Sequence, residues 1–197
     1  RPLVEQVFTS LYPRSIIVPK GVTEIYSEAF ENCFWLASIA LPDGLKKIGI
    51  KAFGDCISLA SITLPDGVTA IGLRAFHGCT SLASITLPDG VTTIEDGVFD
   101  GCSSLASINL PAGLTTIKGG AFLDCSSLVS INLPEGLTTI KNGVFYGCRS
   151  LASIVIPETV DIIGRQIFGG CDSLIAVNLP RYLPFASSLL PGSPGFG

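Results

Sequence analysis

The sequence lacks most of what nucleic-acid-binding, membrane-spanning or catalytic proteins need. Its 197 residues include no Met, one His and one Trp, and only 14% are charged. Pro, Asp, Gly or Ser interrupts each apolar run well short of the roughly 18 to 20 residues of a spanning helix. The net charge of −4 provides neither a basic footprint for nucleic acid nor a polybasic patch for a membrane surface. We therefore expect no nucleic-acid binding and no membrane insertion.

Groups that carry out catalysis are equally scarce. A nucleophilic serine needs a base that a third group orients, and His77 is the only histidine. Zinc motifs with two histidines are therefore impossible, and the glycine-rich phosphate-binding and dinucleotide-binding motifs are absent. We interpret His77, at a turn-like position, as an exposed loop residue. The sequence predicts no enzyme, no catalytic residue and no cofactor.

Apolar and turn-forming residues are abundant, and they follow a strict order. Hydrophobic residues make up 47% of the chain, alongside 22 Gly and 13 Pro, and the mean hydropathy is +0.56. Such a chain can bury enough apolar surface to offset the entropy of folding, so disorder is excluded. Each cysteine lies 23 residues after the previous one, at Cys33, Cys56, Cys79, Cys102, Cys125, Cys148 and Cys171.

Other residue types repeat at the same interval. A Phe precedes each cysteine by three residues, from Phe30 to Phe168, and a Leu follows each by three, from Leu36 to Leu174. A fixed period of 20 to 50 residues indicates a solenoid, in which each unit buries its apolar side chains against the next. Helical bundles and compact α/β folds do not explain a strict period. We predict one solenoid domain over residues 16–180, with seven full repeats and the start of an eighth.

One repeat predicts a short β-rich coil. Residues 61–64 alternate polar and apolar side chains, which is typical of a strand with one buried face. Pro, Asp and Gly at 65–67 then supply a turn. Residues 68–71 can form a second short extended or turn-like segment, and the apolar spacing within 75–79 suits a helical or 3₁₀ turn.

The pattern resembles a known repeat family. The segment L-x-x-I-x-L at residues 59–64 resembles the strand of a leucine-rich repeat. The longer pattern C-x-x-L-x-x-I-x-L-P-x-x-L-x-x-I-x-x-x-A-F is similar to the BspA-like subclass of bacterial and protozoan surface proteins, over about residues 16–180. In the commonest leucine-rich repeats Asn or Cys follows the strand, whereas here the cysteine precedes the strand leucine. We therefore expect no buried Asn ladder.

The resemblance carries expectations for architecture and role. It implies a curved solenoid with a parallel sheet on the concave face, and turns, short 3₁₀ segments or short strands on the convex side. It also implies non-enzymatic protein binding or adhesion by a protein that is secreted or attached to the cell surface.

The cysteine column predicts a buried ladder of reduced thiols. Stacked repeats place neighbouring cysteines about 5 Å apart, and their parallel side chains keep the Cβ atoms beyond the 3.5 to 4.5 Å that a disulfide prefers. A straight column also cannot form the tetrahedral cage of structural zinc. We therefore expect these thiols to act as small hydrophobic groups.

The predicted strand face carries two exposed columns with almost no charge. One is mostly Ser, and the other holds Ala, Thr, Asn or Val. We expect these side chains to hydrogen-bond an extended protein or glycan; the alternative is that they only solvate a tightly stacked sheet. The expected curvature disfavours an ice-binding lattice. The candidate binding residues on this face are Ser61, Thr63, Ser84, Thr86, Ser107, Asn109, Ser130 and Asn132.

Acidic residues form a third column. Asp43, Asp66 and Asp89 each lie in a Pro-Asp-Gly turn, one repeat apart. A divalent cation or a basic partner would relieve their mutual repulsion, which makes them a candidate metal site. The alternative is that each Asp serves its turn alone, with its charge partly screened.

The two ends depart from the repeat. Phe34 and Trp35 stand at the N-terminal end, Trp35 where other repeats have Ser. Exposed aromatic residues mark interfaces, so both are candidate binding residues; the alternative is that they pack under an N-terminal cap. We assign residues 1–15 to that cap and residues 181–197 to a C-terminal flap and linker. We expect a piece of a longer protein, with any signal peptide or anchor outside it.

These features predict a non-enzymatic module that presents a rigid, extended concave surface to a partner. The partner would be a protein, such as a host or matrix protein, or a glycan. Two alternatives remain: a purely structural spacer in a larger surface protein, and a cation-dependent adhesin that uses Asp43, Asp66 and Asp89.

Overall fold

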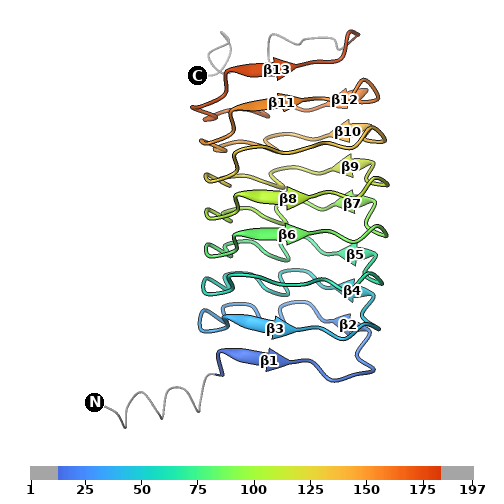
Figure 1. Ribbon diagram of the computed structural model, residues 1–197, viewed down its shortest axis with the longest axis vertical. Coiled ribbons are helices and arrows are strands. Elements are labelled where there is room, and N and C mark those ends of the chain that lie inside the picture. Colours follow the sequence, from blue (N-terminus) through green and yellow to red (C-terminus); the bar gives the residue numbers. More distant parts are fainter. Residues whose placement is uncertain (1–12, 183–197) are drawn as a thin grey trace, which may run out of the picture.

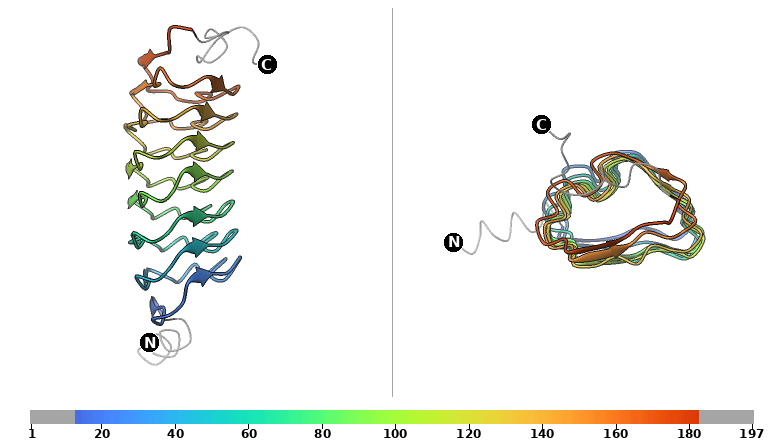
Figure 2. Two further views of the ribbon diagram at one scale, coloured as in Figure 1. Left: turned by 90° about the vertical axis from the view of Figure 1, so that its right-hand side faces the viewer. Right: turned by 90° about the horizontal axis from the view of Figure 1, so that it is seen from above.

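The chain winds into a stack of similar coils, a parallel β-solenoid (Figure 1). The structure is a computed structural model and describes residues 13–182. Seen from above, the traces of successive coils superpose (Figure 2). Residues 13–182 include no helix, and thus none long and apolar enough to cross a membrane. The prediction of a solenoid is confirmed.

Strands lie on two sides of the stack, and every pairing is parallel between residues 23 apart, as for Ile16 and Ile39. The three-residue strands lie on one side, which we call the strand face. They are β1 (Ser15–Ile17), β3 (Ser38–Ala40), β6 (Ser84–Thr86), β8 (Ser107–Asn109), β11 (Ser153–Val155) and β13 (Ala176–Asn178). The two-residue strands follow the turn after each strand-face segment. They are β2 (Glu24–Ile25), β4 (Lys47–Ile48), β5 (Ala70–Ile71), β7 (Thr93–Ile94), β9 (Thr116–Ile117), β10 (Thr139–Ile140) and β12 (Ile162–Ile163).

We number the coils by the first residue of each strand-face segment, so that coil 1 begins at Ser15, coil 3 at Ser61, coil 4 at Ser84 and coil 6 at Ser130. Of the alternatives for the remaining sides of the coil, turns and short strands are present, and the described coils include no 3₁₀ segment. The predicted cap at 1–15 and flap at 181–197 lie almost entirely outside the described residues and stay predictions.

A column of stacked phenylalanine rings runs through the core. Phe53, Phe76, Phe99, Phe122 and Phe145 are completely buried. Neighbouring rings are nearly parallel, within 9°, and their centroids lie 5.3–6.0 Å apart. Since equivalent rings are related by one coil step, this distance is the coil spacing on that side. It exceeds the 4.7–4.9 Å of paired strands, which favours curvature toward the strand face.

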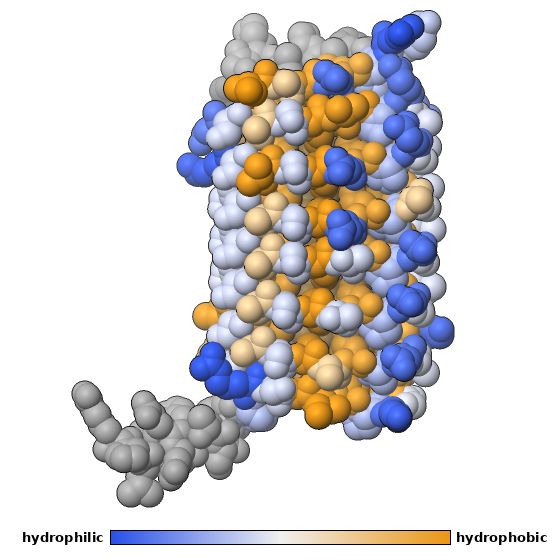
Figure 3. Space-filling model, viewed as in Figure 1, coloured by the Kyte–Doolittle hydropathy of each residue, from blue (hydrophilic) through white to orange (hydrophobic). Residues whose placement is uncertain are grey.

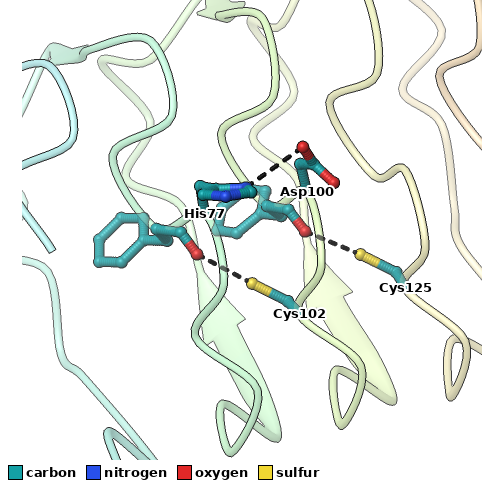
Figure 4. A network of polar contacts seen from close by, with 6 residues as sticks. His77, Asp100, Cys102 and Cys125 are labelled. Carbon is teal, nitrogen blue, oxygen red and sulfur yellow. Dashed lines mark hydrogen bonds and ion pairs between the residues drawn. The ribbon is translucent and has the colours of Figure 1, made fainter. Parts of the chain in front are cut away.

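The cysteines form a second buried column, and the structure adds a bond that the sequence did not predict. Each buried thiol donates a hydrogen bond to the carbonyl of the Phe 26 residues before it, at 3.0–3.2 Å. Figure 4 shows two such bonds, from Cys102 and Cys125. All seven cysteines are free, and six are buried. Cys33 is only half-buried, which corrects the expectation of a fully buried ladder, because it lies in coil 1, at the N-terminal end of the described stack.

Strand pairing is interrupted at regular places although the coils continue. On the strand face, β1 pairs only with β3, β6 with β8, and β11 with β13. Residues 61–63 in coil 3 and 130–132 in coil 6 form no strand. The two-residue strands split once, between β5 and β7. Coils 3 and 4 are therefore joined by neither set of strands.

Other contacts hold coils 3 and 4 together. The amide of Phe76 donates to the carbonyl of Val98 at 2.9 Å, and that of Gly78 donates to Asp100 at 2.8 Å. The rings of Phe76 and Phe99 stack with centroids 5.7 Å apart. The Phe and Cys side of the coil thus continues where the strands stop.

Hydrogen exchange of backbone amides should detect the missing strand pairing between coils 3 and 4. The amide of Leu87 donates to Asn109 at 3.0 Å, whereas the amide of Leu64, at the same position one coil earlier, has no partner within residues 13–182. Both side chains are buried, with 7% and 3% of their surface exposed for Leu64 and Leu87. We expect the Leu64 amide to exchange at least ten times faster, since local protection follows the backbone bond. Native-state exchange measured by NMR would contradict this if both amides were equally protected.

Alkaline pH should destabilise the fold. Burial raises the pKa of Cys171 to about 11 and of Cys56 and Cys102 to about 12, from an ordinary value of 9.0. Above pH 9 the unfolded chain therefore binds fewer protons than the folded one, and the free energy of unfolding falls as pH rises.

Each such thiol lowers the free energy of unfolding by about 1.4 kcal/mol per pH unit between pH 9 and its folded-state pKa. Below pH 9 its stabilising contribution is fully present. Urea unfolding under reducing conditions, measured between pH 7 and pH 10.5, checks the slope. Replacement of one thiol, Cys102→Ala, should make the slope shallower. A slope that is identical in the variant would show that the buried thiols do not cause it.

Candidate binding surface on the strand face

All eight polar residues predicted on the strand face are exposed. In β8, for example, Ser107 and Asn109 point outward while Ile108 points into the core. In Figure 3 the serine column forms a pale stripe along the molecule, and the second column varies in colour with its Ala, Thr, Asn and Val side chains. Neighbouring coils are linked within a column, because the Nδ2 of Asn109 donates to the Oγ1 of Thr86 at 3.2 Å. The structure thus brings these side chains together on one surface.

No charged residue interrupts this surface. From coil 2 onward, the six residues from the one before each Ser to the following Pro contain no Asp, Glu, Lys or Arg, as in residues 37–42 and 106–111. Charged residues are depleted at the core of protein interfaces relative to the rest of the surface. The strand face shares that composition from coil 2 to the last described coil.

The C-terminal part of the strand face carries exposed apolar side chains among its polar ones, which the sequence analysis did not single out. Val129, Val155 and Ile175 are 53%, 60% and 90% exposed. Val155 replaces the Thr or Asn of other coils, while Val129 and Ile175 replace Ala. These substitutions within otherwise regular columns were the sequence signal that could have predicted the apolar side chains. A partner that covers this end would bury apolar area as well as polar groups.

Two cavities open where the strand pairing stops. One of about 400 Å³ lies between coils 3 and 4, and one of about 190 Å³ lies between coils 6 and 7. The first is lined by Ser61, Thr63, Leu64, Asp66, Ser84 and Thr86, with neighbouring core residues. The second is lined by the equivalent residues Ser130, Asn132, Leu133, Glu135, Ser153 and Val155.

The three predicted acidic residues are all exposed, but they differ in what they line. Asp66 borders the larger cavity, whereas Asp43 and Asp89 border neither cavity. Within residues 13–182, no group of three or more His, Cys, Asp and Glu side chains is arranged to hold a metal ion. The geometry thus gives the Asp column no metal centre in the described coils.

The two aromatic candidates differ in environment. Phe34 is 60% exposed, whereas Trp35 is half-buried and packs against the core. Tyr26, another aromatic near this end, is 73% exposed. Packing against the molecule is therefore observed for Trp35 and not for Phe34. Any contribution from residues 1–12 lies outside the described part of the chain.

His77 is not the exposed loop residue that the sequence suggested. It is half-buried, and its Nδ1 lies 3.2 Å from the Oδ2 of Asp100 one coil later, without hydrogen-bond geometry (Figure 4). Burial raises the pKa of Asp100, an effect that the neighbouring side chains of His77 and Arg74 oppose. Because both residues directly follow the core Phe of their coils, the pair lies on the Phe and Cys side and links two coils.

Comparison with known proteins identifies the repeat. Residues 3–125 and 92–187 match the model of the BspA type leucine rich repeat region. A leucine-rich repeat protein of T. pallidum is 38% identical, with a TM-score of 0.78 over 82% of this chain and 78% of that one. No curated protein matches the chain.

Two longer structures are also similar. A leucine-rich repeat protein of Eubacterium ventriosum is 27% identical with a TM-score of 0.78, over 87% of this chain and 45% of that one. A leucine rich cell surface protein of Faecalibacterium prausnitzii is 28% identical with a TM-score of 0.56, over 89% and 61%. This chain therefore spans less than two thirds of either protein.

The coil geometry, the 23-residue register and these matches agree with one another. Leucine-rich repeats form a non-enzymatic scaffold fold whose members generally mediate protein interactions. The chain belongs to the BspA-type leucine-rich repeat family.

Proposed function

We propose that this chain is a non-enzymatic protein-binding module and that the strand face is its binding surface. The observation that carries the proposal is the exposed, charge-free surface that runs along the coils and is fixed by the buried core behind it. A partner that docks there pays little for ordering the module, because its side chains are short and its backbone is already held in place. The family's general role in protein interactions supports this assignment.

We further propose an adhesive role at a cell surface or after secretion. The support is the relative from Faecalibacterium prausnitzii, which is described as a leucine rich cell surface protein. Rigid, repeated surfaces suit adhesion because several weak contacts along one axis act together. A matrix or host protein is the partner class that we favour over a glycan, because the strand face has apolar Val129, Val155 and Ile175 at one end.

A structural spacer is the competing function, and one observation favours it. Coils 3 and 4 carry the same S-I-T-L-P segment on the strand face, at residues 61–65 and 84–88. Such uniformity is typical of repeated structural units as well as of binding surfaces. A spacer requires the stack to be rigid but requires no ligand on the strand face.

Charge insertion tests the proposed binding surface. Thr86→Lys places a charge at the centre of the strand face, where Thr86 is exposed. Thr69→Lys is a matched control on another side of the coil, where coil 2 already has Lys46 at the equivalent position. Binding to a panel of immobilised extracellular-matrix proteins and to a glycan array would be measured for all three proteins.

We expect saturable binding to a matrix protein that Thr86→Lys weakens at least ten-fold, a loss of about 1.4 kcal/mol, and that Thr69→Lys leaves unchanged. Binding that both variants weaken equally would place the interaction elsewhere. Absence of saturable binding to every protein and glycan would favour the spacer.

A further inference from the structure

The two cavities on the strand face are equivalent sites three coils apart. We call the cavity between coils 3 and 4 slot A and that between coils 6 and 7 slot B. Each slot begins at a coil whose strand-face segment is unpaired, and each carries one carboxylate at the same repeat position, Asp66 or Glu135. The sites therefore share both their position in the coil and their acidic group.

The chemistry of the slots favours a cationic side chain. Ser61, Thr63 and Ser84, which each carry a hydroxyl group, line slot A, and the Asp66 side chain of this slot is exposed. Neither Asp66 nor Glu135 forms an ion pair within residues 13–182. No Lys or Arg lines either slot. An ammonium or guanidinium group entering a slot would thus find hydroxyl acceptors and an unpaired carboxylate.

The unpaired backbone adds acceptors of its own. No backbone hydrogen bond joins residues 61–64 to residues 84–87 in the described chain, although Ala83 donates to Ala60 just before them. The carbonyl groups that a paired strand would use therefore lack a backbone donor from the neighbouring coil at slot A. A side chain with several N–H donors, such as Arg, uses such acceptors best.

The spacing of the slots selects an extended polypeptide. Three coils at parallel-strand spacing put the slots about 14 Å apart along the stack. In an extended chain, residues i and i+4 point to the same side and lie about 13 to 14 Å apart. The long stems of Lys and Arg absorb a small difference between the two lengths. Residues i and i+3 point to opposite sides and cannot reach both slots.

We propose that slots A and B bind two basic side chains, four residues apart, from an extended segment of a protein partner that lies along the strand face parallel to the solenoid axis. The proposal rests on the proposed function, since it names the kind of partner that the strand face takes. The two polar columns of the strand face carry no charge between the slots, whereas in the acidic column Asp89 lies between Asp66 and Glu135 but borders neither slot. The segment is recognised by spacing and charge.

Labelled synthetic peptides test the proposal directly. One extended peptide of alternating Thr and Val carries Arg at positions i and i+4, and a second of identical composition carries Arg at i and i+3. Fluorescence anisotropy with the full 197-residue chain would report the two affinities. We expect the i, i+4 peptide to bind at least ten-fold more tightly, with an affinity that falls as salt is added.

Two double variants distinguish binding of the peptides at the slots from general attraction between their charge and that of the protein. Asp66→Asn with Glu135→Gln should abolish the preference for the i, i+4 peptide. Asp43→Asn with Glu158→Gln removes the same charge from exposed residues outside both slots and should keep the preference. All four residues are exposed, so circular dichroism should show both double variants folded.

Equal binding of the two peptides, or an equal loss in the two double variants, would overturn the proposal. That failure is distinguishable from failure of the proposed function. If Thr86→Lys still blocks a matrix protein while the peptides show no spacing preference, the strand face binds protein but the slots do not select basic side chains. Binding of glycans alone would overturn both.

Discussion

The structure depends on one constraint: each buried side chain packs against its own counterpart one coil away. A single coil has no second layer to cover its apolar residues, so its neighbours must do so. The Phe rings satisfy this with near-parallel stacking along the whole described stack. The thiol bonds follow the same step, since a cysteine 26 residues after a Phe is one coil and three residues away. A change of register would break every column together.

Strand pairing is secondary to this core. The Phe stack and the thiol bonds continue through coils 3 and 4, where both sets of strands are interrupted. The core therefore maintains the stack, and hydrogen bonds between strands form only between some neighbouring coils of the strand face. The interruptions leave the slots that distinguish an otherwise uniform face. The continuous core keeps the stack rigid, and the interrupted strand pairing leaves the openings that we propose for recognition.

The sequence predicts the columns well, because a strict period assigns each residue a place relative to its equivalents. It cannot predict where the strands pair. Residues 61–65 and 84–88 have the same sequence, yet only the second includes a strand, so the residues of the segment alone do not determine whether it pairs. The contact of His77 with Asp100 could be predicted from the sequence, since the two residues occupy the same repeat position in neighbouring coils. The outward position of Phe34 could be predicted in the same way, because the equivalent residues of later coils include Thr80 and Arg149, which are polar and exposed.

Deletion of whole and partial coils tests the central claim most directly. Removing residues 84–106 deletes one coil and restores every column, whereas removing residues 84–95 deletes fewer residues but misaligns all later coils. Urea unfolding followed by circular dichroism would compare the two proteins. The account predicts a cooperative transition for the 23-residue deletion and none for the shorter deletion. If the shorter deletion were as stable as the longer one, packing of equivalent residues would not determine this fold.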